Sequence, residues 1–199
     1  MSVKFFHEHP QNPHLDKRFA NIKNINIHDH LYQLLDRFDK FVQHHEASFW
    51  LDYGSALGVY RVECILPHDD DIDLGMIKTE FNKLPDLWES DTFLWEKNPY
   101  AVTLDRFDEH NTVAARFICK RTGIFLDVFL YEVTETGIMY NNESMRNSEL
   151  WVQHDDVFPL VKRRFGDHMY HTPKHLEIYL LRYYNNDLSI PPQFLHYYQ

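Results

Sequence analysis

The stretch Pro67-His68-Asp69-Asp70-Asp71-Ile72-Asp73-Leu74-Gly75-Met76 holds four carboxylates within five positions and then turns apolar. From Asp71 onward acidic and apolar residues alternate, and this period of two predicts a strand with one buried face. In such a strand Asp69, Asp71 and Asp73 share the opposite face. Like charges this close repel one another at neutral pH unless cations offset the repulsion or water solvates the groups fully. The stretch therefore predicts either a cation site or a solvated acidic turn.

A cation bound here would be a hard divalent ion, because all the available ligands are carboxylate oxygens. Two carboxylates at positions i and i+2 of a strand can hold one or two such ions, as Mg²⁺ is held in many phosphoryl-transfer sites. A calcium loop of the EF-hand type is an alternative, since Asp69, Asp71, Asp73 and Glu80 have its spacing. Leu74 stands where that loop requires glycine, and a Pro-containing segment replaces the entering helix, so both features count against it.

Upstream, Gly54-Ser55-Ala56-Leu57-Gly58 separates an expected strand, 48–53, from an expected short helix, 56–61. A Gly-Ser turn before a helix aims backbone N–H groups and a hydroxyl at one point, which suits a phosphate group. Such turns are common. This one indicates a phosphate site only because an acidic strand follows it some fifteen residues later.

Downstream, Asp127 interrupts the apolar run Phe125-Leu126-Asp127-Val128-Phe129-Leu130. A carboxylate among apolar strand residues is costly to bury unless it binds something. We interpret it as a third metal ligand beside Asp71 and Asp73. The alternative is an aspartate on the exposed face of an edge strand.

Other segments show the periodicities of regular structure. The expected elements are a helix over 27–45, a helix over 78–90 around Pro85, strands over 113–120 and 125–132 joined by a turn at 121–123, a polar loop over 136–150, and a final helix that opens at Thr172-Pro173 and buries Leu176, Tyr179, Leu180 and Tyr183. This mixture is typical of an α+β or α/β fold. We take the α+β form, a small mixed sheet flanked by helices.

Composition limits the function classes. The chain has 199 residues and a net charge of −10, with 44% hydrophobic and 16% aromatic residues, which supports one domain with a large core. The acidic balance disfavours non-specific nucleic-acid binding, which depends on Lys and Arg. The two cysteines, Cys64 and Cys119, cannot build a disulfide framework or a zinc site. No signal peptide or membrane span is apparent, so we expect a cytoplasmic protein.

The segments Trp50–Gly58, Arg61, Ile65–Pro67 and Asp69–Met76 together closely resemble the signature of the LicD/fukutin family, within the polymerase-beta-like nucleotidyltransferase superfamily. The resemblance extends to the second acidic strand and to the C-terminal segment, so that it covers about 27–192. The matching residues there are Leu126–Phe129, Phe158-Pro159-Leu160, Arg164-Phe165-Gly166, Pro173 and Tyr179-Leu180. Departures at His68, Val62-Glu63-Cys64 and Asn185 bear on the substrate more than on the metal.

The resemblance implies a single domain over 1–199, with an irregular arm over 1–25, a nucleotidyltransferase-type core over 26–135 and a C-terminal helical extension over 136–199. It also implies metal-dependent transfer of a phosphorylated alcohol, such as phosphocholine or ribitol phosphate, from a CDP-linked donor such as CDP-choline to a glycan acceptor, releasing CMP. Asp71 and Asp73 would then hold Mg²⁺ or Mn²⁺, and Asp127 would complete the site and help deprotonate the acceptor.

Further substrate-binding candidates surround this set. Gly54 and Ser55 would hold a phosphate, and Arg61 would neutralise it or simply lie at the surface. Asp69 and Asp70 would orient the metal ligands or contact the acceptor. Lys162 and Arg163, in the compact basic run Lys162-Arg163-Arg164, would bind an anionic donor or acceptor, or form a solvated turn.

Two other functions stay open from the sequence. One is transfer of a nucleoside monophosphate to a small molecule, a protein or RNA, and the released nucleotide distinguishes it. The other is a non-catalytic module that binds a divalent cation or a carbohydrate, for which calcium binding without nucleotide affinity would be diagnostic.

Overall fold

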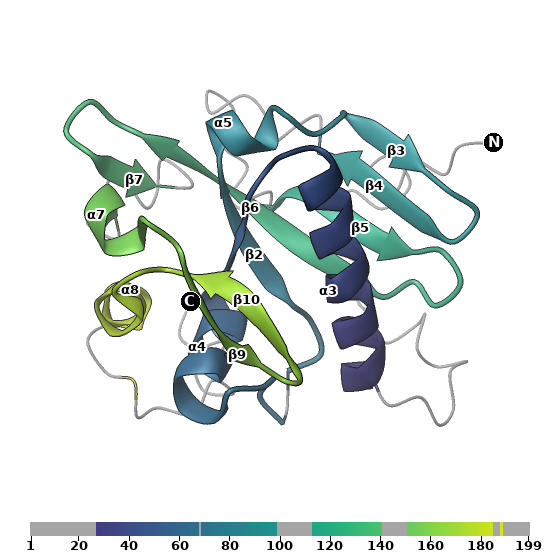
Figure 1. The fold of residues 1–199 in the computed structure, drawn as a ribbon, viewed down its shortest axis with the longest axis horizontal. Coiled ribbons are helices and arrows are strands. Elements are labelled where there is room, and N and C mark those ends of the chain that lie inside the picture. The colour runs from purple at the N-terminus through teal and green to yellow at the C-terminus, as the bar shows by residue number, and fades with distance from the viewer. Residues whose placement is uncertain (1–26, 68, 99–112, 141–150, 185–187, 189–199) are drawn as a thin grey trace.

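The fold is a mixed β-sheet flanked by helices (Figure 1), and the computed structural model describes residues 27–67, 69–98, 113–140, 151–184 and 188. The elements are α3 (Ile27–His44), β1 (Trp50–Leu51), α4 (Tyr53–Val62), β2 (Asp73–Ile77), α5 (Lys78–Phe81), β3 (Leu87–Glu89), β4 (Phe93–Lys97), β5 (Val113–Cys119), β6 (Phe125–Val133), β7 (Ile138–Tyr140), β8 (Val152–Gln153), α7 (His154–Val157), β9 (Val161–Phe165), β10 (His168–Thr172) and α8 (Leu176–Tyr183). The expected α+β class is confirmed.

The central sheet has the strand order β1-β2-β6-β5-β4-β3, and β7 and β8 extend it beyond β6. The β2–β6 pair is parallel, whereas the neighbouring pairs along the path are antiparallel, so the sheet is mixed. The parallel register sets Asp73 of β2 directly opposite Asp127 of β6. This register is what brings two carboxylates from distant segments of the chain together.

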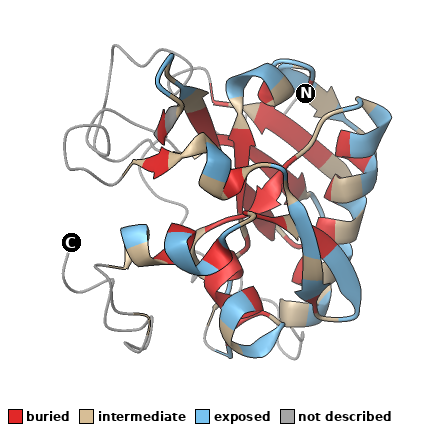
Figure 2. Cartoon of the chain, turned by 60° about the vertical axis from the view of Figure 1, so that its left-hand side comes forward, coloured by how far each residue is buried: buried red, intermediate tan, exposed pale blue. Residues whose placement is uncertain are grey.

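Helix α3 covers one face of the sheet and matches the helix expected over 27–45. Its apolar side chains recur at spacings of three and four, and the buried ones are Leu31, Leu34, Leu35, Phe38, Phe41 and Val42. The Phe38 ring lies 5.7 Å from the Trp95 ring of β4 and 5.3 Å from the Phe117 ring of β5. Figure 2 shows the buried strands enclosed by helices with exposed outer faces.

The hairpin of β5 and β6 is also confirmed, with Gly123 in its turn at φ 75°.

Several expected elements differ from the structure. The helix expected over 78–90 is wrong beyond Phe81, because the chain continues into β3, where Trp88 pairs with Trp95. The strand expected over 48–53 is limited to Trp50–Leu51. The acidic strand begins at Asp73, so Asp69 and Asp71 lie in the irregular segment before it and not on one strand face.

The C-terminal extension is not purely helical. Two of its strands, β9 and β10, form a separate antiparallel hairpin, and β7 falls within the stretch expected to be a polar loop. Thr172 ends β10 instead of capping a helix, and α8 begins at Leu176. It buries Leu176, Tyr179 and Leu180 as expected, whereas Tyr183, also expected to be buried, is only partly buried. The arm over 1–25, His68, Asn185 and the Pro191-Pro192 pair lie outside the described residues.

Within the part of the chain that the structure describes, no helix combines the length and the apolar character needed to cross a membrane.

Candidate active site

Three carboxylates meet where β2 begins. Asp73 opens β2, Asp71 precedes it by two residues, and Asp127 faces Asp73 across the parallel register. Burial raises the pKa of Asp71 to about 7, and the negative charges of Asp127, Asp70 and Asp69 add to the rise. Burial, then Asp71 and Asp127, raise the pKa of Asp73 well above its ordinary value. The carboxylates are therefore close enough to oppose one another's ionisation, which a bound cation would reverse.

Arg116 of β5 pairs with one of these carboxylates. Its Nε donates to Oδ1 of Asp127 at 2.6 Å and its Nη2 donates to Oδ2 at 3.2 Å. The guanidinium carbon also lies 4.2 Å from the centroid of the Phe125 ring. Both charged residues are only 8% exposed. Burial raises the pKa of Asp127, and the Arg116 charge and hydrogen bonds oppose that rise.

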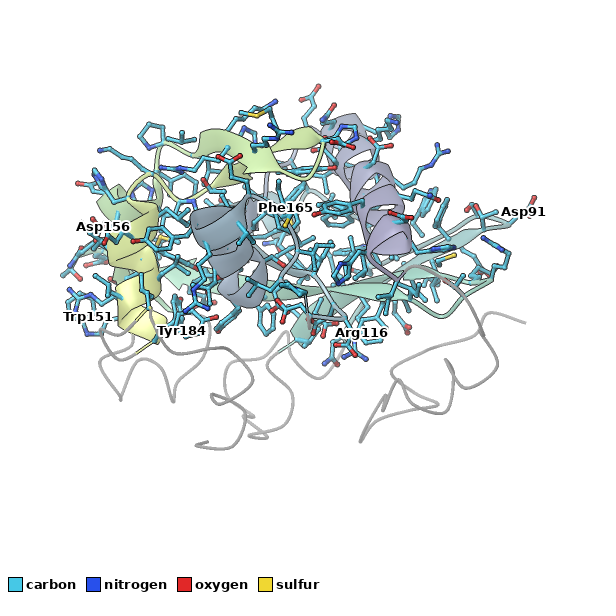
Figure 3. The ribbon with its side chains drawn as sticks, turned by 90° about the horizontal axis from the view of Figure 1, so that it is seen from below. Asp91, Arg116, Trp151, Asp156, Phe165 and Tyr184 are labelled. Atoms are coloured by element: carbon cyan, nitrogen blue, oxygen red, sulfur yellow. The ribbon has the colours of Figure 1, made fainter. Side chains whose placement is uncertain are left out.

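Two of the three carboxylates, Asp73 and Asp127, lie with Arg116 in one row across the sheet. Glu96 of β4 is in register with Arg116, Arg116 with Asp127, and Asp127 with Asp73. The row thus places one guanidinium among three carboxyl groups on four adjacent strands. Figure 3 labels Arg116 on the side of the sheet away from α3.

The first turn of α4 lies against this row. Asp52 caps the helix by accepting from the Tyr53 N–H at 2.8 Å, so Gly54 and Ser55 lie inside the first turn and not in a turn before it. The helix therefore starts earlier than expected. The Ser55 hydroxyl accepts from the Asp73 N–H at 3.0 Å, and the Asp52 N–H donates to the Asp73 carbonyl at 2.9 Å. Both backbone groups of Asp73 are thus held from this turn.

Gly54 allows Asp69 to approach the same turn. A Cβ at Gly54 would lie 3.1 Å from Oδ2 of Asp69, closer than ordinary packing permits. Asp69 is also tied to α3, because its carbonyl oxygen lies 2.8 Å from Nε2 of His28. Asp69 is half-buried, and Asp70 beside it is exposed. The structure therefore brings Gly54, Ser55 and Asp69 to the carboxylates.

The remaining basic candidates are placed differently. Arg61, in the last turn of α4, donates to the Leu188 carbonyl. Lys162 and Arg163 lie on β9, on the side of the sheet opposite Arg116 (Figure 3). Arg163 donates to the carbonyls of Pro173 at 2.7 Å and Lys174 at 2.8 Å, and so ties the hairpin to the chain before α8. The structure does not bring Lys162 and Arg163 to the acidic cluster.

A comparison with known protein families identifies the family to which this chain belongs. Residues 46–175 match the family described as LicD/FKTN/FKRP, nucleotidyltransferase domain. This chain belongs to the LicD family. The expected family is thus confirmed, and the matched range contains the three carboxylates, the first turn of α4 and Arg116.

Individual relatives of this LicD domain are distant. An uncharacterised protein of Rickettsia prowazekii is 28% identical over 138 residues, which cover 68% of this chain and 47% of the relative. A Haemophilus influenzae protein named lipopolysaccharide cholinephosphotransferase LicD is 27% identical over 109 residues, covering 50% of this chain and 40% of the relative. The chain therefore spans less than half of either relative's length.

The carboxylates of the LicD domain fit a magnesium ion in part. Mg²⁺ in proteins is commonly held by one or two carboxylates together with substrate phosphate oxygens, and Asp71 and Asp73 supply two carboxylates. Among the described residues no set of three acidic, histidine or cysteine side chains is arranged to hold a metal ion. Both oxygens of Asp127 accept from Arg116, so a third ligand at Asp127 stays a prediction. The EF-hand alternative loses further support because Glu80 accepts from Ser48 and pairs with Lys83.

Two site residues of the LicD domain were not singled out from the sequence. Asp52 stands two residues before Gly54, and aspartate just ahead of a helix is a common N-cap, which is the signal that could have indicated its role. Arg116 stands in an otherwise apolar strand, the same kind of signal that drew attention to Asp127.

Proposed function

We propose that this LicD protein transfers a phosphorylated alcohol, of the phosphocholine or ribitol phosphate type, from a CDP-linked donor to a glycan hydroxyl. The observation that carries the proposal is the register of Asp73 against Asp127 with Asp71 beside them, next to the first turn of α4. Membership in a nucleotidyltransferase family and the name of the Haemophilus influenzae relative support the choice of reaction.

In this proposal Asp71 and Asp73 hold Mg²⁺ or Mn²⁺, which when bound neutralises charge on the donor pyrophosphate. The first turn of α4 receives a phosphate through the backbone N–H groups of Gly54 and Ser55. The Ser55 hydroxyl already accepts from the Asp73 N–H, so its own proton remains to be donated to a phosphate oxygen. The same side chain thus orients a metal ligand and binds the donor.

The transfer forms a bond between the acceptor oxygen and the β-phosphorus of the donor, and breaks the bond from that phosphorus to the bridging oxygen, which leaves with CMP. Asp127 accepts the proton of the glycan hydroxyl. Its raised pKa brings the carboxylate closer to the range in which a general base is effective, while the Arg116 charge and hydrogen bonds favour its ionised form.

Thermal unfolding with nucleotides and metals tests the proposal. A ligand at one hundred times its Kd stabilises the native state by about 2.7 kcal/mol, and a chain of this size gains roughly 2–4 °C per kcal/mol. We expect CMP and CDP-choline or CDP-ribitol to raise the Tm only with Mg²⁺ or Mn²⁺, and Asp71→Asn to abolish the shift. The exposed Asp91→Asn in the turn between β3 and β4 is the matched control.

Other outcomes would replace the proposal. A metal-dependent shift with other nucleotides only would indicate transfer of a nucleoside monophosphate. A shift with Ca²⁺ and no nucleotide would indicate a binding module without catalysis. If Asp71→Asn leaves the cytidine-dependent shift intact, the assignment of the metal ligands fails.

A further inference from the structure

A buried network of hydroxyl groups converges on Asp52. The Asp52 side chain is fully buried, and besides the Tyr53 N–H it accepts from the Tyr131 hydroxyl at 2.7 Å and the Tyr179 hydroxyl at 2.5 Å. The Tyr183 hydroxyl lies 2.8 Å from that of Tyr131. One carboxylate thus joins α4, β6 and α8.

Backbone and side-chain hydrogen bonds link this network to Asp73 in the proposed site. Asp52 is the residue whose N–H holds the Asp73 carbonyl, and its own carbonyl accepts from the Ala56 N–H at 2.9 Å. Three bonds from residues of this turn therefore depend on the position of Asp52: one to the Asp73 carbonyl, one to the Asp73 N–H through Ser55, and one inside α4.

The turn that Asp52 holds is strained. Tyr53 has φ of 37°, a positive value that is uncommon for residues other than glycine. Such a conformation persists only where the surrounding structure holds it. The centroid of the Tyr53 ring lies 4.8 Å from that of the Phe129 ring and 5.0 Å from that of the Tyr183 ring. Helix α8 therefore packs against the strained residue as well as against its neighbour Asp52.

Burying a carboxylate at a helix end costs free energy, because the charged group loses its hydration. Replacing a buried ionic group by apolar side chains of similar volume is often neutral or stabilising. Packing alone therefore does not account for Asp52 and its tyrosines, whereas holding the first turn of α4 in one geometry does. Two of the three tyrosines, Tyr179 and Tyr183, lie in α8, beyond the range 46–175 that matches the family.

We propose that Asp52 is a positioning residue for the phosphate-binding turn and for Asp73, and that α8 holds it in place through the hydroxyl groups of Tyr179 and Tyr183. This inference rests on the proposed function for its effect on nucleotide affinity. Helix α8, which follows the matched range, then contributes to the geometry of the nucleotide site.

The test compares Tyr179→Phe with Tyr60→Phe in the full chain. The Tyr60 hydroxyl donates to Glu177 at 3.1 Å, so it joins the same two helices, α4 and α8, at the exposed end away from Asp52. Both variants remove one hydroxyl group between α4 and α8. Only Tyr179→Phe removes a contact to Asp52, so Tyr60→Phe is the matched control.

The first readout is native-state hydrogen exchange, which needs no ligand. In Tyr179→Phe we expect the amides of Ala56 and Asp73 to exchange at least tenfold faster relative to those of β5, and in Tyr60→Phe we expect no such local change. A change that is uniform across the sheet, or none at all, overturns the positioning role. Tyr183→Phe, which acts through Tyr131, provides a milder version in case Tyr179→Phe does not fold.

The second readout is the Kd for CMP with Mg²⁺, measured well below the melting temperature of every variant. We expect Tyr179→Phe to weaken binding at least fivefold and Tyr60→Phe to leave it unchanged. Equal affinity in wild type and Tyr179→Phe overturns the link to the nucleotide site. If the wild type binds no cytidine nucleotide, the proposed function fails, and the exchange measurement alone decides the positioning role.

Discussion

Replacing Arg116 by methionine removes the cation that pairs with Asp127 while keeping an unbranched stem of similar length to the arginine stem. Arg116 and Asp127 are each 8% exposed, and the two are joined by contacts of 2.6 and 3.2 Å. Breaking a buried ion pair of this kind leaves an uncompensated charge, which costs about 3–5 kcal/mol. Ordinary domains have only about 5–15 kcal/mol of stability, so we expect Arg116→Met to fold but to unfold far more readily.

Urea unfolding measures this cost directly, and a double-mutant cycle isolates the pair. The cycle compares wild type, Arg116→Met, Asp127→Asn and the double variant, and the pair interaction is expected to be on the order of 1–3 kcal/mol. The double variant should be more stable than Arg116→Met alone, because it buries no unpaired charge. Arg121→Met, in the exposed turn between β5 and β6, is the control for loss of an arginine.

Two results would refute this reasoning. A loss below about 1 kcal/mol in Arg116→Met would mean that water reaches Asp127 and compensates its charge, as at a surface pair. Strictly additive effects in the cycle would mean that the two side chains do not depend on one another. Either result would also remove the basis for regarding Asp127 as a carboxylate kept charged by Arg116.

Three further predictions concern the turn and the sheet. Gly75→Ala should destabilise the fold by about 1–3 kcal/mol in thermal or urea unfolding, because its Cβ would lie 2.2 Å from the Trp50 ring. Ser55→Ala should cost about 1 kcal/mol of stability, since the Asp73 N–H loses its acceptor, and should also weaken binding of CMP with Mg²⁺ in calorimetry. The pKa of Asp52 is raised by burial from 3.8 to about 6, so the unfolded chain releases its proton first and wild type loses stability between about pH 4 and pH 6. Unfolding measured across this range should show Asp52→Asn gaining up to about 3 kcal/mol relative to wild type as the pH rises, and a pH-independent difference would contradict the shift.

Local patterns predicted those parts of the fold in which neighbours in the chain decide the structure. The three-and-four spacing that predicted α3 depends only on residues within a few turns of one helix. The hairpin of β5 and β6 was likewise predicted by two apolar runs around a turn with Gly123. The acidic stretch, the Gly-Ser segment and Asp127 also indicate one chemical set from residue types and spacing alone.

Patterns of short segments did not decide between helix and strand. The stretch after Phe81 was predicted as helix, yet β3 forms because Trp88 and Trp95 pair across a hairpin and pack on the core. The basic run at Lys162 is compatible with a turn or a binding site when only the sequence is considered. It lies in β9, however, and the Arg163 side chain ties the hairpin to the chain before α8. Cross-strand pairing, which a single segment does not contain, settled each case.

The sequence by itself determined the family of this protein, its set of acidic residues, and the helix and hairpin that carry local signals. Only the tertiary structure decided which of these groups meet. Asp52 is 79 residues from Tyr131 and 127 from Tyr179, and Asp127 lies opposite Asp73 through the parallel register of β2 and β6, not through chain proximity. Hydrogen bonds and ion pairs between such distant residues depend on strand order and register, which are set by packing of the whole core and not by any local pattern.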